Sequence, residues 1–165
     1  MTDARLVPIV QPVPYKVVFD WLLTPLGTLD QADELATAVI VALATDALAG
    51  PDDVLPDLDD DDRRGWWADV DAKEIWGGWP IGSQLWLLER SKITDFDSRE
   101  GATLARAEEY TQAALQPFID QRIASEIHIR AERNAENYSR IDVAVTIYRG
   151  PLPAIALRFD SMWGA

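Results

Sequence analysis

The sequence predicts an α+β fold: a small antiparallel sheet packed against two main helices, with a long ordered loop rich in Trp and Asp. Two patterns predict it. Apolar residues recur three and four positions apart in two segments before residue 120, and they alternate with polar residues in three segments after residue 125. At 165 residues, the chain is long enough to bury a core as a single domain.

The N-terminal half begins with an extended segment. Residues 1–14 contain three prolines, so we expect a Pro-rich N-terminal arm that cannot be a central strand, followed by a single domain over 15–165. Residues 16–22 predict a strand, and Thr28 and Gln31 have the spacing of a capping box that opens a helix. The apolar positions of this helix are Leu35, Val39, Ile40, Leu43 and Ala47, and Gly50-Pro51 ends it.

The second half changes from a helical to a strand period. Residues 83–92 predict a short helix, and Asp97 with Glu100 opens a longer one that kinks at Pro117 or ends soon after it. The stripe of the longer helix is Leu104, Ala107, Thr111, Ala114, Leu115 and Phe118. Three half-buried strands follow, and their inward sets are Ile127, Ile129 and Ala131, then Ile141, Val143, Val145 and Ile147, then Ile155, Leu157 and Phe159. His128 and Asp142 fall on the opposite, polar face.

Residues 51–82 stand apart because they show little regular periodicity. A connection longer than about 15 residues in a compact domain is usually functional or disordered. Five of the seven tryptophans lie between Trp66 and Trp86, which argues against disorder. Tryptophan beside arginine is typical of the centre of a protein–protein interface. We therefore expect 51–82 to be an interface loop, and the predicted interface residues are Arg63, Arg64, Trp66, Trp67, Trp76, Trp79, Glu89 and Arg90.

The same residues also have plainer interpretations. The two arginines are suited to local pairing with the aspartates at 57 and 59–62. The tryptophans also suit a hydrophobic cluster that ties the loop to the domain, with one of each pair inside and the other outward. Trp86 lies among leucines, so we expect it in the core. Consecutive aspartates lack the spaced ligands of a calcium loop, and we expect no metal there.

Composition excludes several classes of function. The chain has no cysteine and one histidine, His128, which leaves no disulfide or zinc–thiolate site and almost no room for a Ser/His/Asp triad. A net charge of −13 disfavours nucleic acid and anionic membranes as partners. We expect no catalytic residues, no cofactor and no metal. The sequence shows neither a signal-peptide layout nor an apolar run of membrane length, so we expect folding in a cytoplasm.

Two fragments carry a resemblance to a known family. They are Asp62-Arg63-Arg64-Gly65-Trp66-Trp67-Ala68-Asp69 and Gly82-Ser83-Gln84-Leu85-Trp86-Leu87-Leu88-Glu89-Arg90, placed between an apolar helix and a strand-rich tail. In this order of pieces, over about residues 20–159, the chain resembles the small baseplate wedge proteins of Mu-like contractile-tailed phages. These belong to a wider group of sheath-initiating wedge proteins that includes a type VI secretion baseplate component. The Glu-Pro-Arg tripeptide of that wider group is absent from this chain.

The resemblance implies a structural, non-enzymatic subunit of a contractile phage-tail baseplate. It implies about six copies per tail in a symmetric ring, located in the virion tail baseplate after assembly in the bacterial host cytoplasm. The implied partners are larger baseplate wedge proteins and, beyond them, tail sheath and tube or hub proteins. The alternative is a tail-associated peptidoglycan hydrolase, a muramidase, which needs a carboxylic acid in an apolar pocket and a second carboxylate about 5–9.5 Å away. Glu74, beside Ile75 and Trp76, is the candidate acid for that alternative.

Overall fold

The computed structural model describes residues 6–12, 15–21, 23–26, 34–57, 59, 61–75, 79–91, 103–137 and 140–160. Its elements, in chain order, are β1 (Leu6–Pro12), β2 (Tyr15–Trp21), α1 (Glu34–Ala44), the 3₁₀ helix η1 (Trp67–Asp71), α2 (Ala72–Ile75), the 3₁₀ helix η2 (Gln84–Leu88), α3 (Thr103–Asp120), β3 (Glu126–Arg133), β4 (Ile141–Arg149) and β5 (Leu152–Asp160). None of the helices in this part of the chain is long and apolar enough to cross a membrane.

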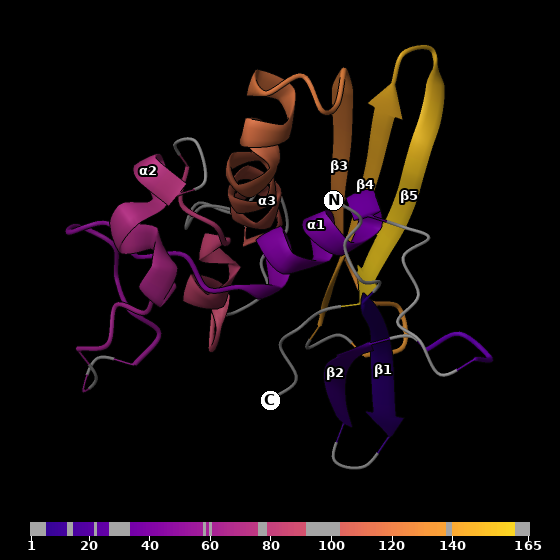
Figure 1. The fold of residues 1–165 in the computed structure, drawn as a ribbon. Coiled ribbons are helices and arrows are strands. Elements are labelled where there is room, and N and C mark those ends of the chain that lie inside the picture. The colour runs from indigo at the N-terminus through magenta and orange to yellow at the C-terminus, as the bar shows by residue number, and fades with distance from the viewer. Residues whose placement is uncertain are drawn as a thin grey trace.

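A three-stranded antiparallel sheet forms the centre of the fold, in the order β3-β4-β5. Helix α3 packs on β3 and β4, and α1 packs against α3 and β5, so the two main helices cover one face of the sheet (Figure 1). Leu43, Leu115 and Ile147 are completely or almost completely buried where these elements meet. The predicted α+β class, with a small antiparallel sheet on two main helices, is confirmed.

Helix α3 follows its predicted apolar stripe. Leu104, Ala107, Leu115 and Phe118 are buried, and the buried Thr111 hydroxyl donates to the Ala107 carbonyl at 2.7 Å. The helix ends at Asp120, three residues after Pro117, where Arg122 takes a left-handed φ of 58° and the Ile123 N–H donates to the Phe118 carbonyl at 2.8 Å. Glu108 on the same helix accepts the outward Ala131 N–H of the edge strand β3 at 2.9 Å, which satisfies one of the donors that an edge strand exposes.

Pro8 and Pro12 lie in the first strand of a hairpin, and Pro14 lies outside the described residues. β1 pairs antiparallel with β2, with Leu6 opposite Trp21 and Pro12 opposite Tyr15. In this two-stranded sheet both strands are edges, which is where proline is tolerated. Figure 1 shows the hairpin, in indigo, projecting below the three-stranded sheet. The division into an arm over 1–14 and a domain over 15–165 stays a prediction.

Three local features differ from the prediction. Helix α1 ends at Ala44 because Asp46 leaves the helix to form a parallel bridge with Ser83. The helix expected over 83–92 is the shorter 3₁₀ helix η2. Asp142 is buried rather than solvated, and its two carboxylate oxygens accept from the Asn134 side-chain amide at 2.9 and 3.0 Å. The capping pairs Thr28/Gln31 and Asp97/Glu100 lie outside the described residues.

Candidate functional site

Both ends of the 51–82 segment are joined to the core at one place. The Ser83 N–H donates to the Thr45 carbonyl at 2.9 Å, and the Ala47 N–H donates to the Ser83 carbonyl at 3.0 Å. The buried Ser83 hydroxyl donates to the Leu43 carbonyl at 2.9 Å. Gly82 makes this close approach possible, because a Cβ at its position would lie 2.8 Å from the Ala47 nitrogen and its φ is +127°. The segment therefore begins and ends on a fixed base.

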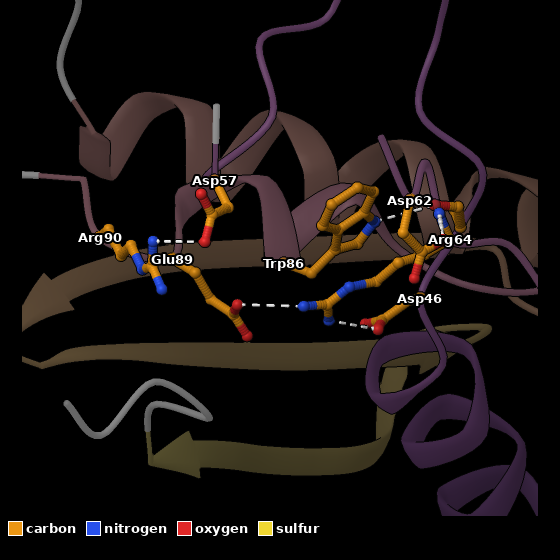
Figure 2. Close-up of polar contacts among 8 residues, drawn as sticks. Asp46, Asp57, Asp62, Arg64, Trp86, Glu89 and Arg90 are labelled. Atoms are coloured by element: carbon orange, nitrogen blue, oxygen red, sulfur yellow. Dashed lines mark hydrogen bonds and ion pairs between the residues drawn. The ribbon is translucent and has the colours of Figure 1, made fainter. Parts of the chain in front are cut away.

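Arg64 is the centre of a second connection (Figure 2). Its guanidinium lies 4.8 Å from the ring centroid of Trp86 and pairs with Asp46 at 2.6 Å and Glu89 at 3.2 Å. The hydrogen bond to Asp46, strengthened by attraction to both carboxylates, raises the pKa of Arg64 above its ordinary value. Trp86 itself is 3% exposed, which confirms its expected core position, and its indole N–H donates to the Ala47 carbonyl at 2.8 Å.

Arg63 closes the start of the segment through backbone contacts. Its guanidinium donates to the carbonyl of Gly50 and to that of Asp53, the latter at 3.3 Å, and its own carbonyl accepts from the Ala49 N–H at 3.1 Å. The Asp53 carboxylate accepts from the Gly50 N–H at 2.7 Å and from the Gln84 amide at 3.0 Å. Arg63 therefore fixes the path of residues 49–53.

Arg90 forms a third connection, from the end of η2 back to the acidic run. It pairs with Asp57 at 2.8 Å (Figure 2). The Asp59 N–H also donates to this carboxylate, at 3.2 Å, and that hydrogen bond together with Arg90 lowers the pKa of Asp57. Four of the predicted interface residues, the three arginines and Glu89, thus lie together in contacts within the chain.

The local pairing expected between the arginines and the aspartate run takes a different form. The ion pairs of the Arg64 side chain reach Asp46 before the segment and Glu89 after it. It is the backbone N–H of Arg64 that donates to the Asp62 carboxylate, at 2.8 Å. Sequence reasoning missed this arrangement because both partners are distant along the chain, and no periodic signal marks them.

The tryptophans of the segment divide between inside and outside. Trp66 is half-buried while Trp67 is 81% exposed, with their rings 5.6 Å apart, which is the division expected for this pair. Trp79 is half-buried, and Trp76 lies outside the described residues. Val70, which sequence reasoning did not single out, is 86% exposed. The sequence carried no signal for it, because Val70 shares a face with Trp67 only through the three-residue turn of the 3₁₀ helix.

In the described part of the chain, the residues considered for catalysis or metal binding do not form a catalytic or metal site. Glu74 is exposed on α2 rather than enclosed in an apolar pocket. Exposed His128 contacts Glu126 at 2.6 Å and the Tyr148 ring at 5.0 Å. Among the described residues, no group of three acidic or histidine side chains is arranged to hold a metal.

An open hollow of about 600 Å³ lies beside the Arg64 contacts. It is lined by Thr45, Asp46, Asp62, Arg64, Gly65 and Trp66.

Two comparisons relate this chain to known proteins. Residues 35–151 match the family model described as "Phage protein GP46". The chain is also 39% identical over 118 residues to "Baseplate protein gp46" of Escherichia phage Mu, an alignment that spans 72% of this chain and 73% of that relative. The family match covers nearly all of α1, the whole 51–82 segment, α3, β3 and β4.

Proposed function

This chain belongs to the phage protein GP46 family, and on that premise we propose that it is an inner wedge subunit of a contractile phage-tail baseplate. The relative in phage Mu is named as a baseplate protein, and at that coarser level this chain is a structural component of a phage tail baseplate. In the proposed role it helps to initiate the sheath and acts through protein–protein assembly rather than catalysis.

The observation that carries the assembly role is the 51–82 segment. It is held to the core through Arg63, Arg64 and Arg90, yet it presents Trp67 almost fully to solvent. Trp and Arg are the residues most enriched at the energetic centres of interfaces. We propose that the segment, with the six predicted interface residues that it contains and with Glu89 and Arg90 after it, builds the surface that docks onto larger baseplate wedge proteins.

The remaining features of the proposal concern the whole tail. About six copies of the chain surround the tail axis, since ring assemblies are built by cyclic symmetry. Tail sheath and tube or hub proteins are the further neighbours, and assembly takes place in the cytoplasm of the bacterial host. Several copies that bind together raise the avidity of the whole assembly, so that a moderate affinity of each individual contact is sufficient.

A muramidase remains the rival function. Its general acid needs an apolar environment that raises the carboxyl pKa. Glu74, the candidate acid, is exposed, which favours the assembly role over hydrolysis at this residue.

The test is genetic complementation of a tail gene cluster that lacks this chain. Wild-type chain is expected to restore tails in electron micrographs and to be present in purified particles at about six copies by quantitative mass spectrometry. Glu74→Gln is expected to restore tails and infection equally well. Particles that form without the chain, or Glu74→Gln particles that assemble but fail to clear peptidoglycan, would contradict the proposal.

A further inference from the structure

Trp67 and Val70 form a hydrophobic ridge on η1, which we call the Trp67–Val70 ridge. We propose that this ridge inserts into an apolar pocket of a larger baseplate protein, and that lysine and arginine side chains surround that pocket. This inference rests on the proposed function and deepens it, because it specifies the chemistry of the partner and separates contact residues from positioning residues.

The geometry of η1 brings the two side chains together. In a 3₁₀ helix with three residues per turn, positions i and i+3 lie directly above one another. Trp67 and Val70 occupy such positions and are 81% and 86% exposed. Exposed apolar side chains that adjoin one another mark an interaction surface, whereas a singly exposed one such as Leu26 does not. Figure 1 shows this part of the chain, around α2, on the side of α3 that is remote from the three-stranded sheet.

The charge around the ridge selects the partner. Residues 51–82 contain ten acidic side chains, nine Asp and Glu74, against three basic ones, which is a net −7 of the −13 carried by the whole chain. Two of the three basic residues, Arg63 and Arg64, are engaged within the chain. Asp71 and Glu74 are exposed directly after the ridge. Complementary potentials accelerate association and fix its register, so a basic rim on the partner is required.

The arginines act by positioning rather than by contact. The guanidinium groups of Arg64 and Arg90 hold Asp46, Glu89 and Asp57, and Arg63 holds the carbonyls that begin the segment. The Asp69 carboxylate continues this network, since it accepts the Ile81 N–H at 2.9 Å across the segment. A surface that is ordered before binding loses less conformational entropy on association. The ridge is therefore presented to the partner in its bound geometry.

The first experiment is a competition for incorporation into tails. Wild-type chain and a Trp67→Ala/Val70→Ala variant, carrying different tags, are co-expressed with the remaining tail genes, and their ratio in purified tails is measured. We expect the variant to be depleted about 30-fold, the effect of losing an interface hot spot. Leu26→Ala is the matched control, because Leu26 is 90% exposed and lies outside the segment, and it should be incorporated equally. Equal incorporation of the ridge variant would overturn the inference.

The second experiment identifies the chemistry of the pocket. A photo-crosslinking amino acid replaces Val70, and the peptide captured in assembled tails is sequenced by mass spectrometry. The inference requires a baseplate peptide with apolar residues flanked by Lys or Arg. Capture of an acidic peptide, of lipid, or of no protein at all would overturn it. A chain that fails to enter tails even as wild type would instead contradict the proposed function, so the two failures are distinguishable.

The third experiment reverses the charge beside the ridge. Asp71→Lys/Glu74→Lys leaves Trp67 and Val70 in place, and we expect it to be depleted about tenfold in the same competition, since like charges oppose docking. Unchanged or increased incorporation would overturn the basic rim.

Discussion

Two regions of the molecule are stabilised by different interactions. One is the three-stranded sheet with helices α1 and α3, and the other is the 51–82 segment. In the former, Leu115 and Ile147 are fully buried and Leu43 nearly so, and each joins a continuous hydrophobic cluster. In the latter, hydrogen bonds and ion pairs from a few side chains, above all Arg63 and Arg64, determine the path of the chain. Burial of apolar area stabilises the fold cooperatively, whereas an exposed ion pair contributes about 0–1 kcal/mol.

This difference implies that the two regions respond separately to substitution. Loss of a core side chain should lower the global free energy of unfolding. Loss of an arginine contact should instead allow the segment to open locally while the core remains folded, because regions with few apolar contacts open at lower free energy. The joint between the two regions is the place where Gly82 approaches Ala47. A substitution there should both lower the global free energy of unfolding and allow local opening.

The largest expected effect belongs to the core. Leu115→Ala removes a side chain with 0% exposure, and we expect the free energy of unfolding to fall by about 2–5 kcal/mol. Chemical denaturation monitored by far-UV circular dichroism measures it, since the chain has seven tryptophans and their fluorescence does not report on the core alone. Glu109→Ala on the exposed side of the same helix should change stability by less than about 0.5 kcal/mol. Equal effects of the two substitutions would contradict the assigned burial of α3.

The joint should be the next most sensitive position. Gly82→Ala places a Cβ 2.8 Å from the Ala47 nitrogen and 2.9 Å from the Thr45 carbonyl oxygen, both of which are backbone atoms. We expect a loss of about 1–3 kcal/mol, together with faster amide exchange at Ala47 and Ser83. Gly150→Ala separates the two causes, because its φ is +76° but no atom lies within 4 Å of the added Cβ. A loss as large at Gly150 would mean that backbone conformation, not the close approach, explains Gly82.

The contrast between the two regions also explains which structural features could be predicted from the sequence alone. The alternation of Ile141, Val143, Val145 and Ile147 predicted a strand and its buried face, and all four are buried. Periodicity reports which face meets a core, so it works where many apolar residues share one environment. It failed at Asp142 on the same strand, because burial there is compensated by specific polar contacts, among them the Asn134 side-chain amide.

In the 51–82 segment, composition singled out the unusual residues but did not predict their contacts or their exposure. The Trp and Arg content singled out Arg64 and Trp67 together, yet the structure gives Arg64 two intrachain carboxylates and leaves Trp67 exposed. The partner of Arg64 on one side, Asp46, precedes it by 18 residues, and Glu89 follows it by 25. Such pairings depend on the folded path of the chain. The exposure of Val70 likewise required the 3₁₀ geometry of η1.

Removing the Arg64 contacts tests whether the 51–82 segment can open while the core stays folded, and the expected change in the free energy of unfolding is smaller than in the core. Arg64→Gln should lower the global free energy of unfolding by no more than about 1 kcal/mol, because its side chain is about a third exposed and its ion pairs are partly screened by solvent. Amide exchange over residues 61–71 should nevertheless accelerate. Arg122→Gln is the matched control, since Arg122 also has a positive φ, 58° against 47° for Arg64. Unchanged exchange in Arg64→Gln would contradict its positioning role.

The smallest expected effect concerns Asp57 and pH. The Asp59 N–H and then Arg90 lower the pKa of the Asp57 carboxyl, so its folded value lies below the unfolded value of about 3.9. The contact therefore stabilises the segment above the unfolded pKa, and this contribution is lost as the pH falls through the folded pKa. Between about pH 5 and pH 8 the segment should not change. An NMR titration of the Asp57 carboxyl carbon measures the shift. In Arg90→Gln the pKa should rise but remain below the ordinary value, because the Asp59 hydrogen bond is the larger cause. A wild-type pKa at or above the ordinary value would show that Arg90 and the Asp59 N–H do not hold the Asp57 carboxylate, and one of the three polar connections of the segment would be lost.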